Sequence, residues 1–179
     1  LVKSPYYIKL VGDKSLSQRD FERVISPLQK VGANFKVNNK KTLPLKMIGS
    51  SFVNPINYFE NRGSAQCKST VMLAALNSPG QTLIRAKKSR DHTENIFKYL
   101  GIPIIIKKNK NNDEIKIRGE KLFKSFKYKV PSDPSSCAFF IVLTLLSKNC
   151  ELKIKNMNVN QSRIGYIEIL NRMGAKIRV

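Results

Sequence analysis

The sequence predicts an α/β protein assembled from repeated β-α-β-α-β-β units, with the repeat array cut at both ends. Three stretches share one pattern: an amphipathic helix end, a glycine, and then a run rich in Ile, Val or Phe. These stretches are residues 28–37, 97–106 and 170–179, with the glycines Gly32, Gly101 and Gly174. Glycine tolerates the positive φ that a helix C-cap needs, and the runs that follow have the composition of strands. Each stretch therefore reads as a helix end followed by a strand.

Two further pairs of segments repeat along the chain. In the first pair, a buried-looking helix leads into a strand: 63–76 into 81–85, and 133–146 into 151–155. In the second pair, a hairpin strand ends on a glycine: 45–49 and 115–119. Together these segments define the order β-α-β-α-β-β for one unit.

One complete unit is expected from about Ile56 to Gly119. Of an earlier unit, we expect only the part from its last helix onward, and a strand at Tyr6–Leu10 precedes that helix. A later copy ends at Val179, within its penultimate strand. We therefore expect an internal fragment of a longer protein.

The chain carries a large excess of positive charge. Of its 179 residues, 33 are Lys or Arg and 12 are Asp or Glu, which gives a formal net charge of +21. Such a balance favours polyanions, phosphorylated metabolites or anionic membranes as partners. The alternative is a solvated surface rich in Lys and Asn, and the densest basic run, Lys107–Lys110, reads as a hairpin turn.

Composition also excludes several classes of protein. Apolar residues form 41% of the chain, enough for a core, and the run Cys137–Leu146 is too short to span a bilayer and reads as a buried helix. The three cysteines are not spaced as metal ligands and there is a single histidine, so no metal site is expected. The first residues contain no signal-peptide pattern. We therefore expect free thiols and a cytoplasmic protein.

Several helix starts are candidates for anion binding, because a helix N-terminus presents free N–H groups and a partial positive charge. At the first, Ser17 with Asp20 fits a capping arrangement, which places Arg19 in the first turn. A guanidinium there could bind a carboxylate or phosphate with two parallel hydrogen bonds. The alternative is an exposed arginine beside Asp13 or Asp20.

The second candidate start combines small and amide side chains. Ser64 can cap the helix or donate to an anion, and Ala65 follows it. Gln66 offers donors and an acceptor suited to a hydroxylated ligand. The alternative is an ordinary serine N-cap without a ligand.

At the third start, Asp91 with Glu94 resembles a capping box. Arg90, next to Ser89, precedes the positive end of the helix, where a cation is unfavourable unless an anion offsets it. This conflict indicates a functional role for Arg90. His92 reads as structural.

A fourth start, Asp133 followed by Pro134, reads as architectural. The sequence contains no nucleophile–base–acid pattern, no GxGxxG and no Walker loop. From the residues alone, the chain is a cytosolic α/β repeat protein with candidate anion sites.

Six segments, in order, resemble motifs of the 5-enolpyruvylshikimate-3-phosphate synthase family. The similarity covers nearly the whole chain, and motifs in the right order are more specific than any one alone. The SRDHTE segment also separates the chain from the sister UDP-N-acetylglucosamine enolpyruvyltransferases. The segments are Gly12–Arg19 (GDxSLxxRP), Ser64–Ser69 (SAQVKS), Ser89–Glu94 (SRDHTE), Val130–Ser136 (VPGDxSS), Asn160–Gly165 (NxxRxG) and Met173–Ala175 (MGA).

The resemblance implies a fold of two domains, each a pseudo-threefold array of β-α-β-α-β-β units in the enolpyruvyltransferase inside-out barrel. Residues 1–122 would be part of the substrate-binding domain, with one partial and one complete repeat. Residues 123–179 would begin the second domain, which the family's chain enters near the segment Val130–Asp133.

The resemblance also implies a reaction in chorismate and aromatic amino acid biosynthesis. The enolpyruvyl group of phosphoenolpyruvate moves to the 5-hydroxyl of shikimate 3-phosphate, by addition and elimination, without metal or cofactor. By motif match, Ser64, Ala65 and Gln66 would hold shikimate 3-phosphate, and Gln66 would reach both substrates. Arg90, with Ser89, would bind the phosphate of shikimate 3-phosphate, and Arg19 would bind phosphoenolpyruvate.

The chain departs from the family pattern in places. Asp20 replaces a proline and puts a carboxylate near a site for anions, Ser132 replaces a glycine, and Pro134 is unusual in its motif. The family's N-terminal Lys-Ser contacts, its Gly-Asn-x-Gly-Thr loop and the acid/base groups of the later domain are absent from these 179 residues. We therefore expect the isolated fragment to lack turnover. The parent is expected to be a monomer, and the fragment is expected to self-associate through its cut edges.

Two alternatives come from other classes of protein. The charge of +21 motivates a nucleic-acid-binding module on this repeat. Aromatic residues form only 8% of the chain and no RNP-like or GXXG motif is present, which disfavours nucleic acid. The other alternative, an RNA-phosphate-processing module such as an RNA-phosphate cyclase relative, shares the repeat style but not these motifs. No membrane partner is expected.

Overall fold

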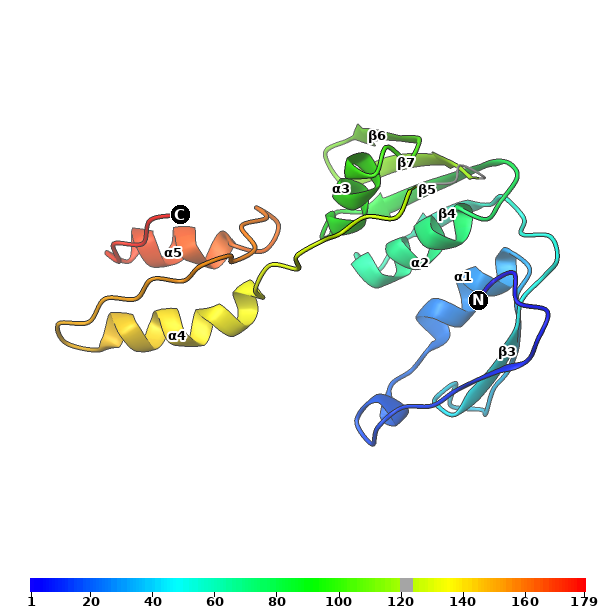
Figure 1. Ribbon diagram of the computed structural model, residues 1–179, viewed down its shortest axis with the longest axis horizontal. Helices are drawn as coiled ribbons and strands as arrows, with labels where there is room; N and C mark the ends of the chain where they lie inside the picture. The colour runs from blue at the N-terminus through cyan, green and yellow to red at the C-terminus, as the bar shows by residue number, and fades with distance from the viewer. Residues whose placement is uncertain (120–123) are drawn as a thin grey trace. The chain divides into compact units, whose positions relative to one another are not determined.

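The computed structural model describes residues 1–119 and 124–179, and the chain divides into two compact units, Leu1–Phe123 and Lys124–Val179 (Figure 1). The domain boundary expected between residues 122 and 123 lies outside the described residues. The first unit contains two sheets.

The complete repeat expected between Ile56 and Gly119 is present in the first unit. Its four strands form one sheet in the order β4-β5-β7-β6, in which β4 and β5 are parallel and β7 is antiparallel to both its neighbours. The expected hairpin at Lys107–Lys110 joins β6 to β7. The elements are β4 (Asn57–Glu60), α2 (Ala65–Ala75), β5 (Gln81–Lys87), α3 (His92–Tyr99), β6 (Ile104–Lys108) and β7 (Asn112–Arg118).

Helices α2 and α3 pack on one face of this sheet. In β5, buried Ile84 and Ala86 alternate with exposed Arg85 and Lys87, as the two-residue period of a strand requires. Burying each large aliphatic side chain stabilises the fold by about 1.5–3 kcal/mol. The core comprises Val71, Met72, Ala75, Ile84, Ala86, Phe97, Ile102, Ile115 and Ile117.

The smaller sheet of the first unit repeats part of the larger one. In its order, β1-β3-β2, the last strand in the sequence lies between the two earlier ones. The order β5-β7-β6 of the larger sheet has the same arrangement. The partial earlier copy is thus confirmed, although its first strand begins at Ile8 instead of Tyr6. The elements are β1 (Ile8–Leu10), the 3-10 turn η1 (Leu16–Gln18), α1 (Glu22–Lys30), β2 (Asn34–Lys36) and β3 (Leu45–Ile48).

The expected positive φ of the three C-cap glycines is confirmed. Gly32, Gly101 and Gly174 have φ values of 112°, 65° and 100°. Each follows a helix, so the sequence pattern located all three helix ends.

The second unit contains α4 (Pro134–Leu146), α5 (Gly165–Arg172) and one parallel bridge between Ser132 and Met157. The strands expected at 151–155 and 175–179 do not form, so that prediction is wrong for the described structure. In the first unit, β5 and β6 each pair with β7. No described residues of 124–179 supply a counterpart of β7, and a strand without a partner has no ladder.

Helix α4 is also less buried than its sequence suggested. Pro134, Cys137 and Ile141 form its buried stripe. Phe139, Phe140, Leu143 and Leu146 are exposed. Within residues 1–119 and 124–179, neither this helix nor any other has the length and apolarity to cross a membrane.

Candidate anion-binding site

The order of the strands brings two candidate helix starts to one edge of the larger sheet. Because β4 and β5 are parallel neighbours, α2 and α3 both begin at their carboxyl ends. The preceding turns lie against each other: a Cβ added to Gly63 would sit 3.7 Å from the carbonyl oxygen of Lys88. This edge of an α/β sheet is where such folds commonly bind ligands.

The start of α2 has the expected serine cap. Ser64 is the N-cap residue, and its hydroxyl accepts a hydrogen bond from the Cys67 N–H at 3.4 Å. Ala65 is half-buried and Gln66 is exposed in the first turn. The first N–H groups of the helix have no intrahelical acceptor, so they can donate to an anion.

A buried ion pair joins the two helix starts. Lys68 Nζ lies 2.5 Å from Glu94 Oε1, and the two side chains are 1% and 4% exposed. The same ammonium donates to the main-chain carbonyl of Arg90 at 2.9 Å. Beside it, the hydroxyls of Ser69 and Thr93 are 2.6 Å apart. The sequence analysis did not predict this pair, and the one available signal was that Lys68 is the single charged residue of α2.

Arg90 lies in the turn ahead of α3, and its side chain is exposed. Asp91 occupies the N-cap but makes no side-chain capping hydrogen bond. The capping box expected for Asp91 and Glu94 is therefore wrong, because the Glu94 carboxylate is paired with Lys68. The hydroxyl of Ser89 is buried and has no hydrogen-bond partner among the described residues.

Arg19 stands apart from the other predicted site residues. It is exposed between η1 and α1, and among the described residues its side chain has no hydrogen bond or ion pair with Ser64, Gln66 or Arg90. Its position ahead of α1 nevertheless matches that of Arg90 ahead of α3 in the repeat. In both turns the arginine is followed by an aspartate.

The capping arrangement expected around Arg19 is wrong. Asp13 accepts the Leu16 N–H at 2.7 Å, and Asp20 accepts the Glu22 N–H at 2.7 Å. Ser17 donates to the Gly12 carbonyl at 3.1 Å. Arg19 therefore follows the short 3-10 turn and does not lie in the first turn of α1.

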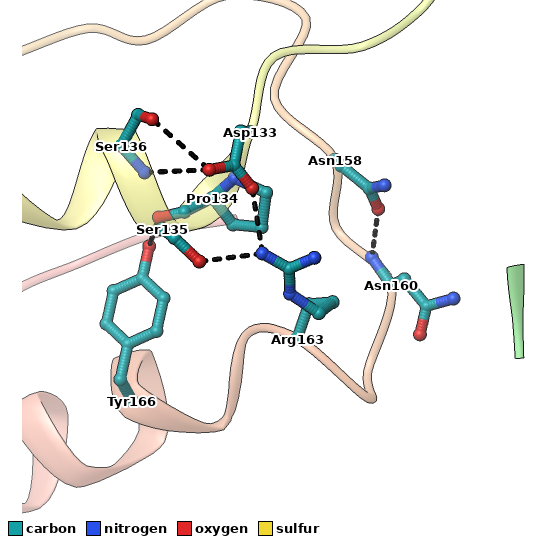
Figure 2. Close-up of polar contacts among 8 residues, drawn as sticks. All are labelled: Asp133, Pro134, Ser135, Ser136, Asn158, Asn160, Arg163 and Tyr166. Carbon is teal, nitrogen blue, oxygen red and sulfur yellow. Dashed lines mark hydrogen bonds and ion pairs between the residues drawn. The ribbon is translucent and has the colours of Figure 1, made fainter. Parts of the chain in front are cut away.

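The second unit contains its own polar cluster at the start of α4 (Figure 2). Asp133 caps the helix by accepting the N–H and hydroxyl of Ser136 at 3.1 and 3.2 Å. Arg163 donates to Asp133 Oδ1 at 2.8 Å and to the Ser135 hydroxyl at 2.6 Å. The Tyr166 hydroxyl donates to the Pro134 carbonyl at 3.1 Å. These bonds tie the loop before α5 to the start of α4 and agree with the architectural reading of Asp133.

Several contacts shift the pKa of Asp133. Desolvation acts to raise it, but hydrogen bonds from the Ser136 and Ser135 N–H groups and the Ser136 hydroxyl, together with the charge of Arg163, hold the pKa below its ordinary value. Desolvation is also the main cause that raises the pKa of Tyr166, and of Tyr58 on β4.

We expect a corresponding pH dependence in the second unit. Because the pKa of Asp133 is lower when folded, its stabilisation is complete above the ordinary carboxyl pKa of 3.8 and is lost as the pH falls through the lowered value. Asp133→Asn should remove this part of the acid dependence. Amide exchange of α4 measured across that range checks it, and identical pH profiles for both proteins would contradict it.

The comparisons with known proteins place this geometry in a family. Residues 1–179 match the family model for EPSP synthase (3-phosphoshikimate 1-carboxyvinyltransferase). The chain is 43% identical over 170 residues to the 3-phosphoshikimate 1-carboxyvinyltransferase of Ruthia magnifica, covering 94% of this chain and 38% of that relative. With that of Petrotoga mobilis it is 40% identical over 177 residues, covering 97% and 40%.

Solved structures agree with the sequence comparisons. An EPSP synthase from Acinetobacter baumannii superposes with a TM-score of 0.80 at 32% identity, covering 98% of this chain and 39% of that one. The repeat fold and the paired helix starts define an α/β protein of the enolpyruvyltransferase type. The chain belongs to the EPSP synthase family. It spans about 40% of the length of the curated relatives that it matches.

Proposed function

We propose that this chain supplies the substrate-binding part of a 3-phosphoshikimate 1-carboxyvinyltransferase. That enzyme transfers the enolpyruvyl group of phosphoenolpyruvate to the 5-hydroxyl of shikimate 3-phosphate. Ser64, Ala65 and Gln66 hold shikimate 3-phosphate, Arg90 and Ser89 bind its phosphate, and Arg19 binds phosphoenolpyruvate. The observation that carries the proposal is the junction of the α2 and α3 starts through Lys68.

Physical chemistry supports an anion at this junction. Two helix N-termini on one sheet edge add their partial positive charges. Arg90 adds a full charge, and the guanidinium can donate two parallel hydrogen bonds to a phosphate. Within this site the negative charge of Glu94 is neutralised by Lys68 at 2.5 Å, so it does not cancel that attraction.

Arg90→Ala tests the assignment of the phosphate. Losing a charged hydrogen-bond donor corresponds to a fall in affinity for shikimate 3-phosphate of about 10- to 100-fold. Arg118→Ala, at the exposed end of β7, is the matched control and should leave the affinity unchanged. Both are measured by calorimetric or NMR titration at fixed salt. Equal affinities for the two variants would reject Arg90 as the phosphate ligand.

The two units fit different parts of the proposed enzyme. Residues 1–122 would form part of its substrate-binding domain and residues 123–179 would begin the second domain. Catalysis needs charge converging on the transition state, so we infer that these 179 residues do not turn over alone. A phosphate-release assay with both substrates checks this, and turnover at the rate of a complete relative would refute it.

We also infer that the protein acts in the cytoplasm, which three free cysteines support. A complete enzyme of this kind would be a monomer. The isolated chain should instead self-associate, because Phe139, Phe140 and Leu143 on α4 are exposed. Sedimentation equilibrium checks this, and a monomer mass at every concentration would contradict it.

A further inference from the structure

We propose that Lys68 is a positioning residue for the anion site, with Glu94 as its counter-ion. Lys68 holds the main chain of Arg90 in place, and thereby fixes the point from which the Arg90 guanidinium reaches a phosphate. This inference rests on the proposed function of Arg90 and adds a residue that touches no substrate itself.

The geometry of the Lys68 ammonium carries the argument. It has two acceptors on the far helix start: the Glu94 carboxylate at 2.5 Å and the Arg90 carbonyl at 2.9 Å. Arg90 lies between the end of β5 and the start of α3, outside the backbone ladders of both. The bond from Lys68 therefore adds a restraint on the main chain of Arg90 that neither ladder supplies. The Ser69–Thr93 hydroxyl contact at 2.6 Å is a second link between the same helices.

Packing alone does not account for a lysine at this position. The Lys68 side chain is 1% exposed, and its neighbours on α2, Cys67, Val71 and Met72, are buried apolar residues. An apolar pair of similar volume would fill the same space without the desolvation cost of two buried charges. An apolar pair could not donate to the Arg90 carbonyl. The feature that requires an ammonium is therefore the restraint on Arg90.

Charge leads to the same conclusion. Glu94 lies in the first turn of α3, four residues after Arg90, and a bare carboxylate there would oppose the binding of a phosphate. Lys68 neutralises this carboxylate at 2.5 Å while leaving the Arg90 guanidinium exposed for a ligand. The Lys68–Glu94 pair thus fixes the main chain of Arg90 and adds no net charge to the site where the phosphate would bind.

The test uses the double variant Lys68→Met/Glu94→Leu, which removes both charges and keeps the interior filled. The readout is the ratio of affinities for shikimate 3-phosphate and for shikimate, which lacks the phosphate. We expect this ratio to fall about 10-fold, with shikimate binding unchanged. In an Arg90→Ala background the same double substitution should cause no further fall, because the residue that it positions is already absent.

Two controls separate positioning from stability and from the proposed function. Met72→Ala, one turn further along α2, should lower stability without changing the ratio. A ratio that is retained in the double variant, or lowered equally by Met72→Ala, overturns the positioning role even if Arg90→Ala weakens binding. Failure of the unsubstituted chain to bind shikimate 3-phosphate would overturn the proposed function instead. If circular dichroism shows the double variant unfolded, Lys68→Gln/Glu94→Gln replaces it, since it also removes both charges and shortens the side chain at position 68 by one bond.

Discussion

Lys68→Met, made alone, should lower the free energy of unfolding of the first unit by about 3–5 kcal/mol. The substitution preserves volume but leaves the Glu94 carboxylate, 4% exposed, without its ammonium partner at 2.5 Å. It also removes the donor to the Arg90 carbonyl. A buried charge without a partner costs far more than the loss of an exposed ion pair, which is worth about 0–1 kcal/mol.

Native-state amide exchange of β5 and β7 reports this change for the first unit alone. Lys116→Met is the matched control, because Lys116 is 41% exposed and pairs with Glu114 at 3.6 Å. Adding Glu94→Leu to Lys68→Met should restore most of the lost stability, since no unpaired charge then remains. A loss for Lys68→Met no larger than that for Lys116→Met would contradict the burial of the Lys68–Glu94 pair.

Gly119→Ala should destabilise the first unit by about 3 kcal/mol, the upper end of the range for overpacking. A Cβ at this position would lie inside van der Waals contact of the carbonyl oxygens of Ala75 and Ser78, at the end of α2. Both contacts are backbone atoms, so no side chain can rotate away. The equivalent glycine of the earlier repeat, Gly49, would likewise meet the Val2 carbonyl oxygen at 2.5 Å.

Gly165→Ala is the matched control for Gly119→Ala. Gly165 is the first residue of α5, and a Cβ there would meet nothing within 4 Å. Alanine should therefore be neutral or stabilise by up to about 1 kcal/mol. Urea unfolding, followed separately for each unit by amide exchange, measures both. Equal effects of the two substitutions would contradict the close packing of β7 against α2.

The parts of the fold that the sequence predicted well have local causes. The order of elements from β4 to β7 follows from strand composition and helix periodicity. The positive φ of Gly32 and Gly101 follows from the identity of the residue itself. The N-cap at Ser64 is also local, because its hydroxyl accepts a hydrogen bond from the N–H of Cys67, three residues further along the chain.

The predictions that were wrong concern features that are set by contacts between residues far apart in the sequence. The Glu94 carboxylate could accept a hydrogen bond from a nearby main-chain N–H or form an ion pair with a lysine distant in sequence. It forms the ion pair, with Lys68 on α2. The strands expected at 151–155 and 175–179 depend on partner strands, which no local pattern reveals. In the same way, the sequence could place Ser64 and Arg90 ahead of helices, but their proximity depends on the order of strands in the sheet.

The central claim is that the starts of α2 and α3 together form one phosphate site. Titration of the isotope-labelled chain with shikimate 3-phosphate, followed by NMR, tests it most directly. We expect saturable shifts of the amides of Ser64–Lys68 and Ser89–Thr93, with one common dissociation constant. Shifts confined to the basic turn Lys107–Lys110, or shifts that do not saturate, would contradict it.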